Sequence, residues 1–301
     1  MATILQRVRN KLVTGYQRRH YMDEASAVMA TPPLAQGSTP FMALSMVHKR
    51  DVLSYLVAVK SFAHFLKPSH ITVVCDPSID DEDRAVFRKH IPFIELRRAE
   101  EFRRPGIPQG GCWERLSAIT EYVAQHYVVQ LDADTLTMAP LKEVEQAILQ
   151  GHGFVLGERE NQSLVTLAQA EANARNWDNR HIQSVCEKRM VTAGLTEQMY
   201  VRGCAGFTGF PPSADMTERM LEFSRRMDAV VDGRWAEWGT EQVTSNYLVA
   251  NAQGTRVLPY PRYSTPEKRI EDIAFFHFIG YVRFVNSLYR NKTKQALGLL
   301  A

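Results

Sequence analysis

The chain has 301 residues, of which 45% are hydrophobic and 23% are charged, and its formal net charge is +3. This length and composition are typical of one large α/β domain or two smaller ones that do not depend on disulfides. The small net charge gives no reason to expect nucleic-acid binding. No apolar run approaches the roughly 20 residues that cross a bilayer, and no apolar signal core follows the basic N-terminus. We therefore expect a cytoplasmic protein whose four scattered cysteines are reduced thiols.

Residues 1–39 form a basic segment that ends in the turn-rich stretch TPPLAQGSTP. Short apolar runs then alternate with segments in which apolar residues recur at helical spacing. Strands are predicted at 41–47, 71–76, 93–96 and 127–131, and helices at 50–66, 80–90 and 113–126. This alternation predicts an α/β fold, with a mostly parallel Rossmann-like sheet flanked by helices in a single domain over residues 40–284.

The second half of the chain is less regular. Residues 158–200 are polar with short helical pieces, which indicates a helical insertion into the domain. After it we expect a glycine-interrupted strand at 199–211, helices at 213–230 and 240–251, and an aromatic strand that runs into a turn over 274–284. Residues 285–301 form a basic amphipathic tail.

Two acids, Asp132 and Asp134, follow the apolar strand at 127–131 directly. Ligands of such sheets bind beyond the carboxyl ends of the strands, and residues i and i+2 of an extended chain share a face. Two converging carboxylates repel one another unless a cation or a proton lies between them, and oxygen ligands suit Mg²⁺ or Mn²⁺. The alternative is that Asp134 only caps a turn.

A second motif lies near the C-terminus, where His277, Gly280 and Arg283 have the spacing H-x-x-G-x-x-R after an apolar strand. An imidazole can complete a carboxylate metal site, glycine allows close backbone approach, and the arginine fork matches phosphate. The alternative is a core histidine and a solvated arginine.

Together these motifs resemble those of nucleotide-sugar glycosyltransferases of the GT-A fold, most closely the family 8 retaining enzymes. The Arg115–Leu116 pair ahead of D-A-D matches that family, as do E-Q-V-x-S-N at 241–246 and H-F-I-G-Y-V-R at 277–283. The resemblance implies that Asp132, Asp134 and His277 bind Mn²⁺ or Mg²⁺, with Asp132 also contacting the donor. It further implies that Gly280 and Arg283 hold the donor diphosphate and that Arg115 lies near its phosphate or sugar.

Two positions depart from the family pattern, and one segment has a second resemblance. Val243 replaces the second acid of D-Q-D, and Cys204 stands where asparagine is common before A-G. The segment W-G-T-E-Q also resembles the W-G-x-E-D of inverting enzymes, in which the acid is the base. Glu241 is the candidate base if the reaction inverts, whereas Gln242 would support the sugar if the reaction retains, which the resemblance favours.

The implied donor is a nucleoside-diphosphate sugar, with UDP as the favoured nucleotide, and the acceptor is a hydroxyl on a carbohydrate or glycolipid. Fold logic places the nucleoside over the end of the first strand, around Ser45, Val47 and Lys49. At both termini basic residues interleave with apolar ones, which suggests either peripheral contact with an anionic membrane or solvated helices on the domain.

Two rival functions stay open at this point. A nucleotidyltransferase of related fold would also need a metal, but it should have a glycine-rich loop after its first strand, and SMVHKRDVLSY contains no glycine. A catalytically decayed nucleotide-sugar-binding protein would account for Val243 and Cys204.

Overall fold

The computed structural model describes residues 4–157, 159–195, 198–266, 271–280 and 282–300. Small parts of the predicted segments lie outside these residues: 1–3 of the N-terminal segment, 158 and 196–197 of the insertion, 267–270 and 281 of the domain at 40–284, and 301 of the tail. A seven-stranded sheet has the order β10-β6-β9-β4-β1-β2-β3. Its strands are β1 (Thr39–Val47), β2 (Pro68–Cys75), β3 (Ile94–Arg98), β4 (Val128–Leu131), β6 (Phe154–Leu156), β9 (Cys204–Phe210) and β10 (Arg256–Val257).

The sheet is mostly parallel, as predicted. Strands β3, β2, β1 and β4 run parallel to one another, and β10 runs parallel to β6. Only β9 is antiparallel, to β4 on one side and to β6 on the other. Because β9 runs antiparallel to β4, the first half of β9 lies beside the end of β4, where the acid pair begins.

Ten α-helices lie around this sheet in the described part of the chain. They are α1 (Ile4–Ala25), α2 (Val52–Leu66), α3 (Asp81–His90), α4 (Trp113–Tyr122), α5 (Lys142–Gln150), α6 (Leu167–Ala174), α7 (Ile182–Glu187), α8 (Met216–Asp228), α9 (Thr240–Ala250) and α10 (Leu288–Gly298). Short 3₁₀ helices occupy Ser26–Ala30, Lys49–Asp51 and Ala99–Phe102. Local sequence explains α3 well, because Asp80 and Asp83 form a reciprocal capping box at its start.

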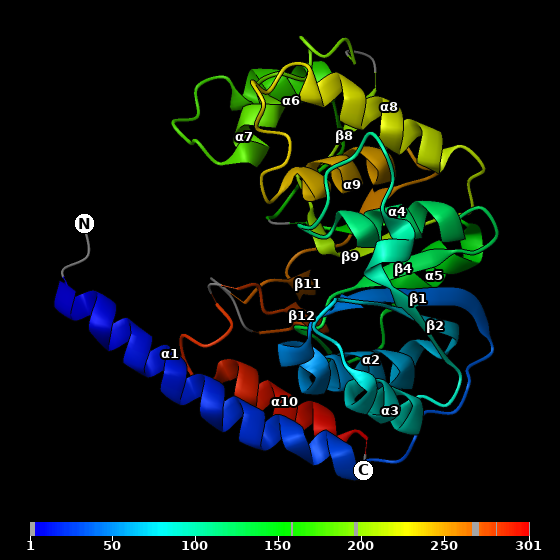
Figure 1. Cartoon of the computed structure of the whole chain (residues 1–301), viewed down its shortest axis with the longest axis vertical. Coiled ribbons are helices and arrows are strands. Elements are labelled where there is room, and N and C mark those ends of the chain that lie inside the picture. The colour runs from blue at the N-terminus through cyan, green and yellow to red at the C-terminus, as the bar shows by residue number, and fades with distance from the viewer. Residues whose placement is uncertain (1–3, 158, 196–197, 267–270, 281, 301) are drawn as a thin grey trace.

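The core has two layers, one on each face of the sheet. Along β1, Phe41 and Ala43 pack into one hydrophobic cluster, whereas Met42 and Leu44 pack into the other. This alternation follows from the period of two along a strand. Figure 1 shows α2 and α3 on one face of the sheet and α4, α8 and α9 on the other. Both faces of the central strands are therefore covered, which is typical of doubly wound α/β folds.

A small second sheet brings the C-terminal motif to the acid pair. It has the order β11 (Tyr263–Ser264), β12 (Phe275–His277) and β5 (Thr135–Thr137). Strand β5 begins just after Asp134 and pairs antiparallel with β12, so that His277 lies opposite Thr135. Within the range 274–284, where a strand running into a turn was predicted, the described residues form the strand β12 over Phe275–His277, opposite the three residues of β5.

The insertion contains α6, α7 and a two-stranded ribbon of β7 (Val165–Thr166) and β8 (Met199–Tyr200). The single strand predicted at 199–211 is therefore wrong: β8 pairs with β7, whereas β9 joins the main sheet. The break falls at Val201–Gly203, where the chain crosses from the insertion to the sheet.

The two terminal segments pack against each other. In Figure 1 the long α1 helix lies beside α10, and both lie on the side of α2. The Tyr21 ring of α1 stacks on the Tyr289 ring of α10 with centroids 4.1 Å apart. Towards the N-terminus α1 leaves the domain, and Leu12 and Tyr16 are 70% and 60% exposed. Among the residues that the structure describes, no helix combines the length and the apolar character that a bilayer span requires.

Candidate active site

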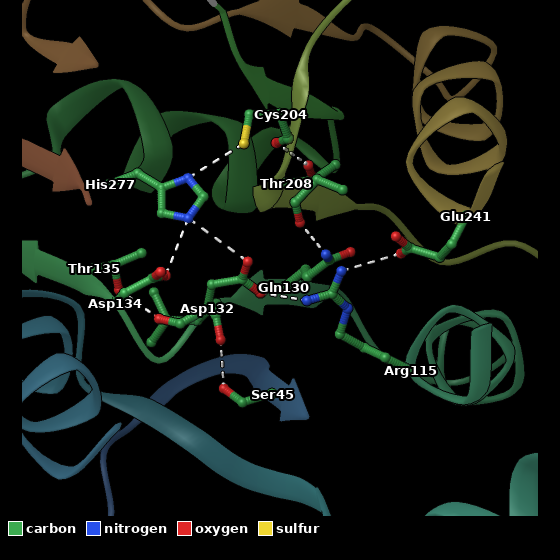
Figure 2. Close-up of polar contacts among 12 residues, drawn as sticks. Ser45, Arg115, Gln130, Asp132, Asp134, Thr135, Cys204, Thr208, Glu241 and His277 are labelled. Carbon is green, nitrogen blue, oxygen red and sulfur yellow. Dashed lines mark hydrogen bonds and ion pairs between the residues drawn. The ribbon is translucent and has the colours of Figure 1, made fainter. Parts of the chain in front are cut away.

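The acid pair and the distant histidine meet at one place. Ligand atoms of Asp132, Asp134 and His277 all lie within 4.8 Å of one another. The His277 Nε2 atom is 3.1 Å from Asp134 Oδ1 and 3.6 Å from Asp132 Oδ2. Figure 2 shows the imidazole edge directed at both carboxylates. Two carboxylates and one imidazole fit a divalent cation that completes its coordination with phosphate oxygens or water, so the donor set suits Mn²⁺ or Mg²⁺.

The neighbouring charges favour a protonated His277 imidazole beside an ionised Asp134 carboxylate. Burial lowers the pKa of the His277 imidazole, but the neighbouring Cys204 and Asp134 outweigh burial and raise it well above its usual value. Burial likewise raises the pKa of the Asp134 carboxyl, but His277 and Arg283 outweigh it and lower the pKa overall. The proton on the imidazole thus offsets the paired negative charges, which is the role a bound cation would take over.

Arg115 on α4 joins the acid pair to the candidate base. Its guanidinium is 5% exposed, forms an ion pair with Asp132 and donates through Nη2 to Glu241 Oε1 at 3.2 Å. Glu241 lies in the first turn of α9 and is 4% exposed. Burial raises the pKa of the Glu241 carboxyl to about 7, although Arg115 opposes the shift. The carboxyl therefore changes its protonation near neutral pH.

The raised pKa of Glu241 predicts how stability depends on pH. Because the folded pKa lies above the usual value of 4.5, the folded state binds this proton more tightly than the unfolded state. The group's contribution to stability therefore falls as the pH rises from 4.5 to about 7 and stays constant above that, a loss of about 3 kcal/mol. Glu241→Gln removes this loss, so the melting temperature of the variant relative to the parent should rise between pH 5 and pH 8.

Thermal unfolding of both proteins at pH 5, 6, 7 and 8 measures this difference. Titrations elsewhere in the chain are common to both proteins and cancel in the comparison. A melting-temperature difference that is the same at every pH would show that the Glu241 carboxyl does not titrate in this range.

A second arginine, Arg283 of the C-terminal motif, also faces the acids. Arg283 donates through Nη2 to Asp51 Oδ1 at 2.7 Å and to Ser54 Oγ at 3.2 Å, and its Nη1 lies 3.9 Å from Asp134 Oδ2. The side chain is 15% exposed. Asp51 and Ser54, at the start of α2, therefore hold this guanidinium beside the acid pair.

A cavity of about 180 Å³ opens over these groups. It is lined by Gly111, Cys112, Arg115, Asp132, Asp134, Cys204, Ala205, Gly206, Trp238, Gly239, Glu241, Gln242, His277, Ile279 and Gly280. Gln242 is partly exposed and lies 3.4 Å from Gln183 of α7, so the insertion borders the cavity. Trp238, 70% exposed at the cavity wall, was not singled out from the sequence, although it opens the W-G-T segment.

Three residues expected around the nucleoside lie outside this cavity, and their role stays a prediction. Ser45 and Val47 are buried, and the Ser45 hydroxyl donates to the Leu131 carbonyl at 2.6 Å. Lys49 is half exposed and pairs with Asp80 at the start of α3. None of the three lines the cavity described above. These residues were predicted only because ligands of α/β sheets bind at the carboxyl ends of strands. In the structure β1 lies between β2 and β4 in the sheet.

Val243 points away from the site. It is fully buried in the hydrophobic cluster that contains α8 and α9. Helical geometry explains this, since Glu241 and Gln242 lie on the cavity side and the next residue is turned about 100° further around the helix. Val243 therefore does not line the cavity.

Comparison with solved structures identifies the architecture. An active-site mutant of LgtC, a GT-A glycosyltransferase of family 8, aligns with a TM-score of 0.53 at 14% identity, covering 87% of this chain and 96% of that one. The glycosyltransferase GlyE of Streptococcus pneumoniae aligns with a TM-score of 0.50 at 13% identity, covering 86% and 61%. The chain has the GT-A glycosyltransferase fold. The sequence matches no protein-family model, and no curated protein matches it either.

The GT-A fold accounts for where the cavity lies. In this chain the acid pair follows β4, next to β9, at the place where the parallel run of strands ends. Asp132 N donates to Gly206 O at 2.9 Å, which fixes the start of the pair against β9. Such positions at the carboxyl ends of strands are where α/β sheets bind ligands.

Proposed function

We propose that the protein is a metal-dependent glycosyltransferase that moves a sugar from a nucleoside-diphosphate sugar, with UDP as the favoured nucleotide, to a hydroxyl acceptor. The observation that carries this proposal is the convergence of Asp132, Asp134 and His277 in one cavity, with two arginines beside them. The GT-A fold and the glycosyltransferases that share it support the same reaction class.

In this proposal Asp132, Asp134 and His277 hold Mn²⁺ or Mg²⁺. The cation supplies neutralisation of the charge that develops on the diphosphate as the sugar–phosphate bond breaks. Arg283 adds a fixed positive charge on the side of Asp134, and Gly280 lets backbone approach the phosphates because nothing lies within 4 Å of its missing side chain. Arg115 stays paired with Asp132 and holds that carboxylate in place.

Gln242 and Glu241 offer two different outcomes at the sugar. We propose retention, with Gln242 supporting the cationic sugar, because Gln242 is the partly exposed member of the pair. Glu241 is 4% exposed, and its carboxylate is already occupied by the Arg115 guanidinium. A pKa of about 7 would suit a base, so we base the choice of Gln242 on exposure rather than on pKa.

A donor screen tests the activity. UDP release is measured from a panel of UDP-sugars with and without Mn²⁺, and proton NMR of the product then reads the anomeric configuration. Turnover that depends on the metal and a product with the donor's configuration are expected. An inverted product would instead indicate that Glu241 acts as the base. Metal-dependent UDP-sugar binding without turnover for any acceptor would favour a non-catalytic binding protein.

We further propose that the free half of α1 contacts an anionic membrane surface, where a lipid-linked acceptor would be found. Residues 9–16 are exposed throughout, and the described part of α1 has no acid before Asp23. Leu12, Val13 and Tyr16 are exposed among basic side chains, which suits an interfacial helix. The basic α10 is less available, because it packs on α1 through Tyr289 and on α2.

Flotation with vesicles containing phosphatidylserine tests this surface. A variant that loses four exposed positive charges of α1 should bind at least about tenfold more weakly, since each charge near such a surface contributes about 1 kcal/mol. Its substitutions are Arg9→Gln, Lys11→Gln, Arg18→Gln and Arg19→Gln. The matched control loses four exposed charges elsewhere, through Arg88→Gln, Lys89→Gln, Lys142→Gln and Arg189→Gln. Equal flotation of the two variants would exclude a specific role for α1.

A further inference from the structure

The imidazole of His277 rests against strand β9. Cys204 and Gly206 are two residues apart on this strand and therefore face the same side. The Cys204 Sγ atom lies 3.2 Å from His277 Nδ1. A Cβ atom added at Gly206 would overlap the ring, approaching Nδ1 to 2.7 Å. Figure 2 shows the sulfur on one edge of the ring and the two acids on the other. The strand thus contacts the ring through the Cys204 thiol and through Gly206, whose lack of a side chain leaves room for the ring.

The Cys204–Gly206 segment is itself held from three sides. Asn246 of α9 donates through Nδ2 to the Gly203 carbonyl at 3.1 Å. The Gln130 amide donates to the Ala205 carbonyl. The Asp132 backbone N–H donates to the Gly206 carbonyl. Cys204 is 9% exposed. Since the same hydrogen bonds tie this segment to β4 and to the acid pair, the sulfur has a fixed position relative to Asp132.

The orientation of the ring determines which nitrogen can bind a cation. Nε2 is the atom that faces Asp134 and Asp132, so Nε2 must present its lone pair and Nδ1 must carry the proton. In that tautomer Nδ1–H donates to the Cys204 sulfur. A metal-binding histidine ordinarily donates its second N–H to a carboxylate, a backbone carbonyl or water, and this partner sets both tautomer and orientation.

We propose that Cys204 is a positioning residue that orients the His277 imidazole, through Nδ1–H···Sγ, so that Nε2 is directed at the metal position between the two acids. The inference rests on the proposed metal site and assigns it a second layer of residues. It also gives Cys204 a specific task, so that its departure from the family's asparagine need not signal decay.

Mn²⁺ titrations followed by electron paramagnetic resonance test this role without any substrate. Cys204→Ala and the nearly isosteric Cys204→Val remove the sulfur acceptor and should weaken Mn²⁺ binding about 10–100-fold. Cys204→Ser keeps an acceptor in the same place and should stay within a few-fold of the parent. Cys75→Ala is the matched control, because Cys75 is a buried thiol of β2 that does not line the cavity, and it should bind Mn²⁺ as the parent does.

Thermal unfolding without metal establishes that each variant is folded, and the valine variant covers the case in which the alanine variant is not. Mn²⁺ affinity of the alanine and valine variants within twofold of the parent would overturn the inference. An equal loss in serine, alanine and valine variants would overturn it too, because the effect would then not follow the hydrogen bond. Absence of Mn²⁺ binding by the parent itself would instead refute the proposed function.

Discussion

Asp134→Ala is expected to abolish Mn²⁺-dependent binding of UDP while leaving the fold intact. The side chain is one of three candidate ligands and lies 3.1 Å from His277 and 3.9 Å from Arg283. Loss of a residue that merely supports a metal ligand costs 10–100-fold in affinity, so loss of a ligand should cost at least about 100-fold. Without the carboxylate, Arg283 also loses one of its two acidic neighbours, so its positive charge near the site is less balanced and opposes a bound cation. Calorimetry with Mn²⁺ and UDP measures the change.

The fold should tolerate this substitution. The Asp134 backbone carbonyl accepts a hydrogen bond from Phe278 N at 2.9 Å, and this backbone contact persists in alanine. Asp228→Ala, an exposed acid at the end of α8, controls for the loss of one negative charge. Mn²⁺–UDP binding by Asp134→Ala that equals the parent's would refute the assignment of this residue to the metal.

Gly206→Ala should disable the same site without removing any ligand. The added methyl group would occupy the space now taken by the His277 ring, with Nδ1 only 2.7 Å from the new Cβ. The ring cannot retreat easily, because His277 is 3% exposed and pairs through β12 with β5. Overpacking of this kind costs about 1–3 kcal/mol, and displacement of the imidazole should weaken Mn²⁺ binding about 10-fold or more.

Two measurements separate these effects: denaturant unfolding for stability and calorimetry for the metal. Gly15→Ala is the control, because nothing lies within 4 Å of the new methyl group and alanine is favourable in the exposed α1 helix. Parental stability together with parental Mn²⁺ affinity in Gly206→Ala would mean that His277 does not sit against β9 as described.

Local sequence was enough to predict strands β1 to β4 and helices α2 to α4. The acid-rich start of α3 and the apolar period of α2 are local signals, and both helices form where expected. It failed at 199–211, because whether a glycine-interrupted run continues as one strand depends on its partners. It also did not predict that Ser45 and Val47 are buried, because their burial depends on the neighbouring strands.

The sequence by itself determined the parallel α/β architecture and the candidate metal ligands, because periodicity and the residue types of D-x-D and H-x-x-G-x-x-R are carried by short stretches of chain. Only the tertiary structure decided that Asp134 and His277, which are 143 residues apart in the sequence, lie within 3.1 Å of each other. It also decided that Arg115 reaches both Asp132 and Glu241, and that Cys204 lies at the back of the imidazole. These contacts depend on which strands pair and which helix ends meet, and no local pattern of residues encodes that pairing.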